Sequence, residues 1–393
     1  MKLKHTYRNV ILYKRFVLFN EPLFRGAVII TSLQKLAHMS LSDIYFMESA
    51  VVVLWALFDI PAGALADLIG RKKTIIIGQI FLLGSFIGFA LMTSPLTAWI
   101  SDILWAIGIS FQSGADKALL QNSLNECKMG NKFKEIEGRA MGSRYLLIAF
   151  CSLVVGPLAE INLRIPLILS VPGFLISFVT SWSFQEPART KGYNPRAQLR
   201  AVREGVAYSV KKKEIRWIVG FCALLMASAK VWFFTYNPYF ERVGIELKYY
   251  GLIFFLLNLI AWLSSRYAKE IERRLGERSC VTTMILSTGV PMLLMGLFPV
   301  QPAAYLVLTQ NVVRGFITPF IGDFVNKHIE SEHIRATVLS VRSSSTNAAT
   351  IAALAWFGVM TTRLDLLESL TALGVAVLAL GKISFRSYER MTK

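Results

Sequence analysis

The chain reads Gly63-Ala-Leu-Ala-Asp67-Leu-Ile-Gly70-Arg71-Lys72-Lys73-Thr74 between two strongly apolar segments. Residues 43–66 before this stretch and residues 74–93 after it are each long enough to cross a bilayer as one helix. A glycine followed by three cations is costly inside hydrocarbon but suits a short polar turn at its cytoplasmic surface. The stretch therefore predicts two membrane helices joined by a cytoplasmic loop.

The composition of the whole chain agrees with this interpretation. Of its 393 residues, 54% are hydrophobic, and the mean hydropathy is +0.49. Twelve spans of about 20 residues need roughly 240 residues, which leaves about a dozen residues for each connection. We therefore expect an all-α integral membrane protein without a separate soluble domain. The expected spans are residues 16–36, 43–66, 74–93, 98–121, 140–160, 164–184, 216–237, 249–265, 280–298, 303–322, 336–357 and 364–381.

The net charge of +18 raises the question of nucleic-acid binding. If the N-terminus is cytoplasmic, about 32 of the 43 Lys and Arg residues fall in cytoplasmic segments and about 5 in external loops, as the positive-inside rule requires. This asymmetry predicts a multi-pass protein of the plasma (inner) membrane with both termini in the cytoplasm. It leaves no unexplained basic patch, so we expect no nucleic-acid partner.

The sequence lacks the patterns of the common enzyme and cofactor classes. It contains no nucleophile elbow and no phosphate-binding glycine loop. Its four cysteines, Cys127, Cys151, Cys222 and Cys280, have neither a disulfide framework nor a zinc-ligand spacing. We expect no catalysis, no cofactor and no metal, and energy from ATP hydrolysis is disfavoured.

Polarity and a weak repeat divide the chain into two halves. The polar, basic segment 186–215 predicts a cytoplasmic linker between an N-terminal six-helix bundle, residues 1–185, and a C-terminal one, residues 216–393. Gly70-Arg71-Lys72 after the second span recurs as Gly276-Glu277-Arg278 after the eighth. Arg139-Ala140 at the fifth span recurs as Arg335-Ala336 at the eleventh. These matches indicate a duplicated unit.

The stretch quoted first closely resembles the loop-2/3 signature of the major facilitator superfamily, with Leu68 and Ile69 where that family often has polar residues. The resemblance implies twelve helices in two pseudo-symmetric bundles, a monomer, and alternating-access transport of a small molecule. Two departures weaken a drug-antiporter interpretation. Gly156-Pro157 resembles the end of the antiporter motif without its glycine repeat, and Leu104 stands where proton-coupled drug exporters carry arginine. Gly-Pro alone predicts a helix kink.

Acids inside the expected spans are candidates for proton coupling. An ionised side chain at the helix centre costs about 2.5–3.5 kcal/mol, so it needs a partner or a watery cavity. Glu21 and Arg25 are spaced one helical turn apart in the favourable acid-before-base order. The pair is either a local ion pair that permits insertion or a protonatable carboxylate tuned by Arg25 beside a cavity. Asp59 and Asp116, at the inner ends of the second and fourth spans, are further candidates.

Four charges are expected near the cytoplasmic face: Asp67, Arg71, Asp116 and Arg342. The family resemblance implies that they form an inter-helix network that stabilises one access state. Its role would be gating rather than substrate contact. The alternative is that these residues are interfacial charges in water.

Polar and aromatic residues of the seventh and tenth spans, with Arg25 of the first, are the candidates for substrate binding. Lys230 and Asn237 share a helical stripe, and Gln310 and Arg314 share a face. Because arginine does not readily lose its proton, Arg314 either pairs with an acid or carbonyls or meets an anionic substrate group. Aromatic neighbours at these positions are more often packing groups than ligand contacts. The full set is Arg25, Lys230, Trp232, Tyr236, Asn237, Gln310 and Arg314.

These features favour proton-coupled export of a small amphipathic or organic-ion substrate across the lipid bilayer. Uptake of a nutrient or metabolite, by symport or facilitated diffusion, is the alternative. A third class is a sensor or scaffold that binds without translocating. The direction of substrate-induced proton movement distinguishes the first two, and counterflow separates both from the third.

Overall fold

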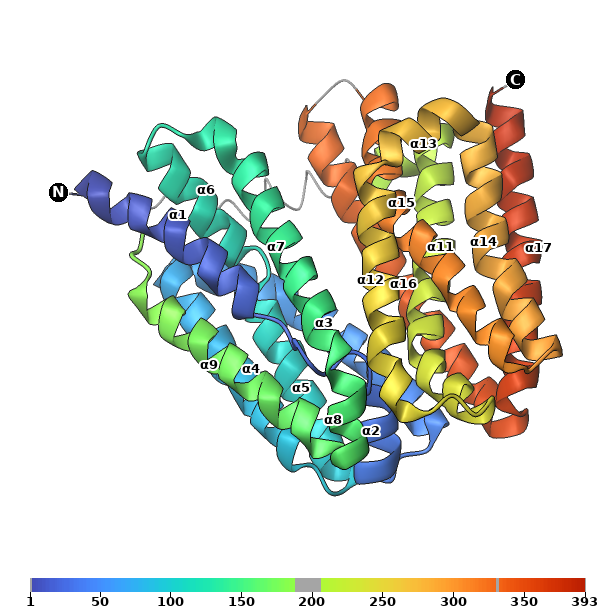
Figure 1. Ribbon diagram of the computed structural model, residues 1–393. Coiled ribbons are helices and arrows are strands. Elements are labelled where there is room, and N and C mark those ends of the chain that lie inside the picture. The colour runs from blue at the N-terminus through green and yellow to red at the C-terminus, as the bar shows by residue number, and fades with distance from the viewer. Residues whose placement is uncertain (1, 188–205, 330–331, 393) are drawn as a thin grey trace. The chain divides into compact units, whose positions relative to one another are not determined.

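The computed structural model describes residues 2–187, 206–329 and 332–392 (Figure 1). All regular secondary structure in these ranges is helical. Within them, seven helices are long and apolar enough to cross a membrane, and one bent pair raises the number to eight. Some of the remaining expected spans are divided between shorter helices, whereas the helices Val307–His328 and Glu332–Arg363 are long but more polar.

The helices of the first half of the sequence are α1 (Lys2–Phe19), α2 (Ile29–Leu36), α3 (Leu41–Ile69), α4 (Arg71–Leu91), α5 (Pro95–Gln112), α6 (Ala115–Glu126), the 3₁₀ turn η1 (Gly130–Lys132), α7 (Phe133–Leu153), α8 (Val155–Ile161) and α9 (Arg164–Ser183). Those of the second half are α11 (Lys213–Arg242), η2 (Leu247–Tyr249), α12 (Tyr250–Arg266), α13 (Ala268–Leu275), α14 (Glu277–Leu297), η3 (Gln301–Leu306), α15 (Val307–His328), α16 (Glu332–Arg363) and α17 (Leu366–Thr392).

Three of the expected spans are broken for visible local reasons. The first span is interrupted between α1 and α2, where Pro22 lacks a backbone N–H and disfavours helix in the residue before it. The fourth span is interrupted at Gly114, whose φ of +75° is strained for residues with a side chain. The fifth span bends by 41° between α7 and α8, beside Gly156-Pro157, which confirms the predicted kink.

The break in the first span corrects one expectation. Glu21 and Arg25 lie in the non-helical segment between α1 and α2, so the i, i+4 helical pairing inferred from their spacing is wrong. The loss of helical geometry frees the two side chains to find different partners. Glu21 pairs with Arg144, and Arg25 lies near Asp102.

The described residues form two compact units, each with its own core. The first draws on residues 1–40, 50–193 and 247–255. In it α4 packs against α5 and α9 (Figure 1). Buried Phe86 of α4 stacks on Phe174 of α9, with ring centroids 4.1 Å apart. A side-chain carbon at Gly78 would lie 2.8 Å from the Gly108 carbonyl oxygen, so glycine is required for the close approach of α4 and α5.

The second unit draws on residues 41–49, 194–246 and 256–393. In it α14 packs against α17, and α11 packs against α16 and α17. Trp217 of α11 lies between Phe221, Phe324 and Tyr388, with ring centroids 4.9 to 5.2 Å away. The Trp217 Nε1 donates to the Ser384 carbonyl, 2.9 Å away, which satisfies the indole N–H and links α11 to α17.

Two short segments belong to the unit that is formed mainly by the other half of the sequence. The start of α3, residues 41–49, belongs to the second unit, where the Tyr45 hydroxyl lies 2.7 Å from Thr235 Oγ1. Residues 247–255, at the start of α12, belong to the first unit. A side-chain carbon at Gly251 would overlap the Ser152 carbonyl oxygen. The predicted division at 186–215 stays a prediction, and residues 188–205 of that linker lie outside the described residues.

Candidate functional site

A cavity of about 340 Å³ opens inside the first unit. Its size falls in the range of small-molecule sites in proteins. Side chains of α1, α5, α6 and α7 and of the break after α1 surround it, and many of them are polar or charged. The lining includes Tyr13, Asn20, Glu21, Trp105, Gln112, Asp116, Lys117 and Arg144.

An ion pair between Glu21 and Arg144 lies on the wall of this cavity. The Arg144 Nη1 is 2.8 Å from the Glu21 Oε1, and neither side chain is more than a third exposed. Burial removes water from both groups, so the Glu21 carboxylate depends on Arg144 to remain charged, whereas the guanidinium keeps its charge in any case. A carboxylate held in this way can exchange its proton only when the environment of the pair changes. This is the property that a coupling group needs.

Asp116 lines the same cavity at the start of α6. Its carboxylate accepts a hydrogen bond from the Lys117 backbone N–H, at 2.7 Å. The Lys117 side chain instead pairs with Glu137, at 3.2 Å. No ion pair of Asp116 occurs among the residues that the structure describes. The cavity therefore contains one paired carboxylate and one that has no cation bound to it.

Three amide side chains meet beside the carboxylates. The Gln79 Nε2 donates to the Asn20 Oδ1, at 2.7 Å, and to the Gln112 Oε1, at 3.1 Å. All three residues are buried, and Asn20 and Gln112 line the cavity. Polar groups inside a membrane bundle are costly unless satisfied, so this cluster marks a second polar element of the site.

Arg25 does not line the cavity. Its guanidinium lies 4.0 Å from the Asp102 carboxylate and 4.1 Å from the centroid of the Phe89 ring. Both Arg25 and Asp102 are almost fully buried. A charged pair enclosed by aromatic rings stabilises the packing of its helices. This placement favours a structural role for Arg25, and its contact with substrate stays a prediction.

Asp59 is exposed and does not line the cavity. The role of Asp59 in proton coupling stays a prediction.

The loop between α3 and α4 is organised by an acid that the sequence did not single out. The Glu186 carboxylate accepts hydrogen bonds from the backbone N–H groups of Arg71, at 2.7 Å, and Lys72, at 2.8 Å. It therefore caps the N-terminus of α4, where a negative charge is favourable. Gly70 has a φ of +102°, and a side-chain carbon there would lie 2.8 Å from this carboxylate.

The expected four-residue gating network is divided in the structure. Asp67 and Arg71 are paired, with 2.5 Å between Oδ1 and Nη2. Asp116 lies at the cavity instead. Arg342 lies in α16 of the second unit. The gating role of the four residues stays a proposal.

The predicted repeat of this loop has matching backbone geometry. Gly276 precedes α14 as Gly70 precedes α4, with φ of +76° and ψ of 156° against +102° and 155°. Two acidic side chains near Gly276 bind a lysine: Lys327 Nζ lies 2.9 Å from Glu272 and 3.4 Å from Glu277. The hydrogen bond to Glu272 raises the pKa of the Lys327 amine.

A chain of polar contacts connects five side chains in the second unit. The Tyr236 hydroxyl donates to Gln310 and accepts from the Asn311 amide, at 3.3 Å. Arg314 donates to the Asn311 Oδ1, at 3.3 Å, and to the Asn258 Oδ1, at 3.4 Å. The predicted shared face of Gln310 and Arg314 is thus part of one hydrogen-bonded group.

Arg314 is the most unusual member of this group. It is the eighth residue of α15, and its side chain is exposed in the second unit. Within the described ranges its partners are neutral amide oxygens, and no carboxylate pairs with it. Of the alternatives left open by the sequence, pairing with carbonyl oxygens, here those of two side-chain amides, is found among the described residues, and pairing with an acid is excluded for them.

The remaining candidates of α11 differ in their access. Lys230 pairs with Glu48, at 3.5 Å, and lies 4.7 Å from the Phe234 ring centroid. Trp232 has no exposed surface, which favours a packing role, and its contact with substrate stays a prediction. Asn237 is also buried.

Comparison with known proteins identifies the family. The sequence model described as "Major Facilitator Superfamily" matches residues 17–354. The chain belongs to the major facilitator superfamily. A curated relative of Bacillus subtilis (strain 168), "Uncharacterized MFS-type transporter YxaM", is 22% identical over 302 residues, which are 72% of each chain.

Solved structures of the superfamily share the fold. A mutant of the nucleoside transporter NupG matches 98% of this chain and 100% of its own, with a TM-score of 0.80 and 14% identity. A bacterial homologue of the human lysosomal transporter Spinster, inward-facing and unoccupied, matches 99% and 98%, with a TM-score of 0.73 and 14% identity. The chain is therefore a multi-pass membrane protein with the all-α fold of two six-helix bundles expected from its loop motif.

Only some residues of the candidate site could be predicted from the sequence. Glu21 and Asp116 were candidates, and both line the cavity. Arg144 could be recognised as a charge within a span, but its partner lies 123 positions away. Asn20, Gln79 and Gln112 were missed, although three amides in apolar spans were a usable signal.

Asp67→Asn is expected to slow turnover more than it weakens ligand binding. The substitution removes the charge that binds Arg71 without changing the size of the side chain, so the cost falls on the loop that must rearrange. The measurement compares the rate of counterflow with the dissociation constant of the substrate. Unchanged turnover with weakened binding would contradict the assignment to gating.

Glu186→Gln is expected to lower the thermal stability of the transporter. A neutral amide accepts one hydrogen bond from the α4 N-terminus but loses the favourable charge, which is worth about 0.3–1 kcal/mol. Thermal unfolding in detergent, with Glu135→Gln as an exposed control, measures the loss. An equal decrease in both variants would rule out capping by Glu186 as the cause.

Proposed function

We propose that this facilitator is a proton-coupled secondary transporter that exports a small amphipathic or organic-ion substrate by alternating access. The observation that carries the proposal is the presence of two carboxylates in one cavity, with Glu21 paired to Arg144 and Asp116 without a bound cation. Loss of the Glu21 charge would release Arg144, so protonation can change the contacts between α7 and the segment after α1. Both termini are proposed to lie in the cytoplasm.

Arg314 supports the choice of substrate class. A permanent cation in the middle part of a membrane helix needs a compensating group. The described residues provide only amide oxygens for it. An anionic group on the substrate supplies the missing charge, and the surrounding apolar and aromatic residues accommodate the rest of an amphipathic molecule. The NupG and POT-family neighbours are named for nucleoside and peptide transport, so such compounds belong in the test.

Reconstitution in liposomes with a trapped pH-sensitive dye tests the proposal. Organic acids, lipophilic cations, siderophore-like chelates, sugars, nucleosides and short peptides are added in turn, and proton movement is recorded. Proton flux opposite to that of the substrate is the expected result. Proton flux in the same direction as the substrate would establish uptake by symport. Counterflow of substrate without proton movement would establish facilitated diffusion.

A further inference from the structure

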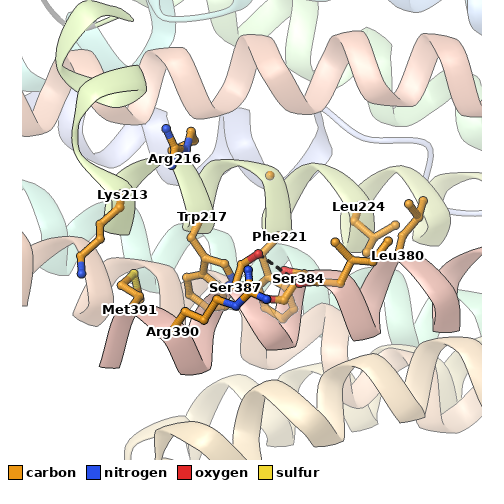
Figure 2. Close-up of a pocket in the computed structure, with 12 residues that line it drawn as sticks. Lys213, Arg216, Trp217, Phe221, Leu224, Leu380, Ser384, Ser387, Arg390 and Met391 are labelled. Atoms are coloured by element: carbon orange, nitrogen blue, oxygen red, sulfur yellow. Dashed lines mark hydrogen bonds between the residues drawn. The ribbon is translucent and has the colours of Figure 1, made fainter. Parts of the chain in front are cut away.

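A groove of about 580 Å³ lies on the second unit between α11 and α17, apart from the polar cavity and from Arg314. Figure 2 shows its two ends. Lys213 and Arg390 lie toward one end, where Arg216 projects from the other side of α11 in this view, and Leu224 and Leu380 lie toward the opposite end. The groove is therefore amphipathic along its length.

The three cations of the groove have no acidic partner among the described residues. Arg216 donates one hydrogen bond to the Val210 carbonyl, at 3.3 Å. Glu389, which precedes Arg390, is bound by Arg278 instead. All three basic side chains are exposed. Three positive charges without compensation make this end of the groove complementary to an anion.

The other end of the groove is apolar. Phe221 and Trp217 form its floor, and the Trp217 indole N–H is already bound to the Ser384 carbonyl. Leu380 and Ile383 stand beside them with 51% and 61% of their surface exposed. These four side chains offer no free polar group to a ligand, and the exposed Leu380 and Ile383 suit a hydrocarbon chain, while Ser384 and Ser387 also line the groove.

The distance between the two ends matches a lipid molecule. Lys213 and Leu224 are eleven residues apart in α11, which corresponds to about 16 Å at 1.5 Å per residue. One leaflet of the hydrocarbon core is about 15 Å thick, half of roughly 30 Å. Lys213 is the first residue of α11 and Arg390 lies in the last turn of α17. The cations therefore lie at headgroup depth when the apolar part lies in hydrocarbon.

We propose that this groove is a binding site for one anionic phospholipid. The phosphate lies among Lys213, Arg216 and Arg390, and an acyl chain follows Phe221 toward Leu224 and Leu380. Basic sites between membrane helices on the cytoplasmic side bind anionic headgroups through the same chemistry. A zwitterionic lipid of equal chain length lacks the net charge that the three cations require, and a free phosphate lacks the chain.

Native mass spectrometry of the full chain in neutral-detergent micelles tests the site. Phosphatidylglycerol and phosphatidylcholine with identical acyl chains are added in equal amounts, and the lipid-bound fractions are compared. Selective retention of one phosphatidylglycerol is expected. Equal retention of both lipids, or complete displacement of phosphatidylglycerol by millimolar inorganic phosphate, would overturn the proposal.

A charge-matched pair of variants assigns the retained lipid to the groove. The triple variant Lys213→Gln/Arg216→Gln/Arg390→Gln is expected to bind phosphatidylglycerol at least about tenfold more weakly. The control, Lys269→Gln/Lys382→Gln/Arg386→Gln, removes three exposed cations of the same unit that do not line the groove. It is expected to bind as the native chain does. Equal losses in the two variants would place the lipid elsewhere.

Thermal unfolding with and without phosphatidylglycerol shows whether the variants are folded and whether the lipid stabilises them. Phosphatidylglycerol is expected to raise the thermal unfolding temperature of the native chain and of the control but not that of the groove variant. An equal rise in all three would contradict the site even if mass spectrometry favoured it.

Discussion

Glu21→Gln is expected to abolish the accumulation of substrate driven by a pH gradient while substrate exchange continues. Glutamine has the size of glutamate but cannot take up or release a proton at neutral pH. If one proton moves per substrate, a gradient of one pH unit is worth about 1.36 kcal/mol, which supports about tenfold accumulation. In the variant this ratio is expected to fall to about one.

The measurement uses liposomes with an imposed pH gradient and labelled substrate, with counterflow as the second readout. Glu135→Gln is the matched control, because Glu135 lies on the same helix as Arg144 but is half exposed and pairs with Arg139. Normal counterflow with lost accumulation assigns coupling to Glu21. Retained accumulation would remove Glu21 from this role and leave Asp116 as the coupling candidate.

A double variant separates coupling from stability. Arg144→Gln leaves the Glu21 carboxylate without its cation, and breaking a buried pair costs about 3–5 kcal/mol. Glu21→Gln/Arg144→Gln removes both charges, so its stability should recover toward that of the native chain. Its coupling should remain absent, because no titratable carboxylate is restored at this position.

The fold could be predicted from local features of the sequence, such as the loop between α3 and α4, whereas much of the candidate site depends on contacts between distant residues. Apolar segments of about 20 residues and the cations between them determine where helices begin and end, and both are local features of a sequence. The partner of Glu21 depends on the rotation of α7 about its axis and on the break at Pro22. Neither the i, i+4 spacing nor the charge of Arg25 carries that information.

Burial distinguishes the candidates that are accessible in the structure from those that are enclosed. Arg25 and Trp232 have residue types that suit substrate binding, but the first is enclosed with Asp102 and the second has no exposed surface. Glu186 could not be singled out, because capping of α4 follows from the path that the chain takes after α9. Side-chain direction, and not residue type, decides these roles.

Arg314 is expected to determine affinity for the charged end of the substrate. Its guanidinium has five N–H donors, and its two contacts to amide oxygens are at 3.3 and 3.4 Å, longer than charge-assisted bonds to carboxylates. An anionic substrate group can therefore take the place of at least one amide. Asn258 and Asn311 hold the side chain in position without neutralising it.

Arg314→Gln is accordingly expected to weaken binding of an anionic substrate by about tenfold or more, since a hydrogen bond to a charged group contributes about 1.5–3 kcal/mol. Arg314→Lys keeps the charge but loses the planar fork, so its loss should be smaller. Equilibrium binding of an organic acid and of its neutral amide to both variants gives the measurement. The neutral amide should bind the native chain and the variants alike. An equal loss of affinity for the acid and the amide would show that Arg314 organises the helices around α15 and does not bind the charged group of the substrate.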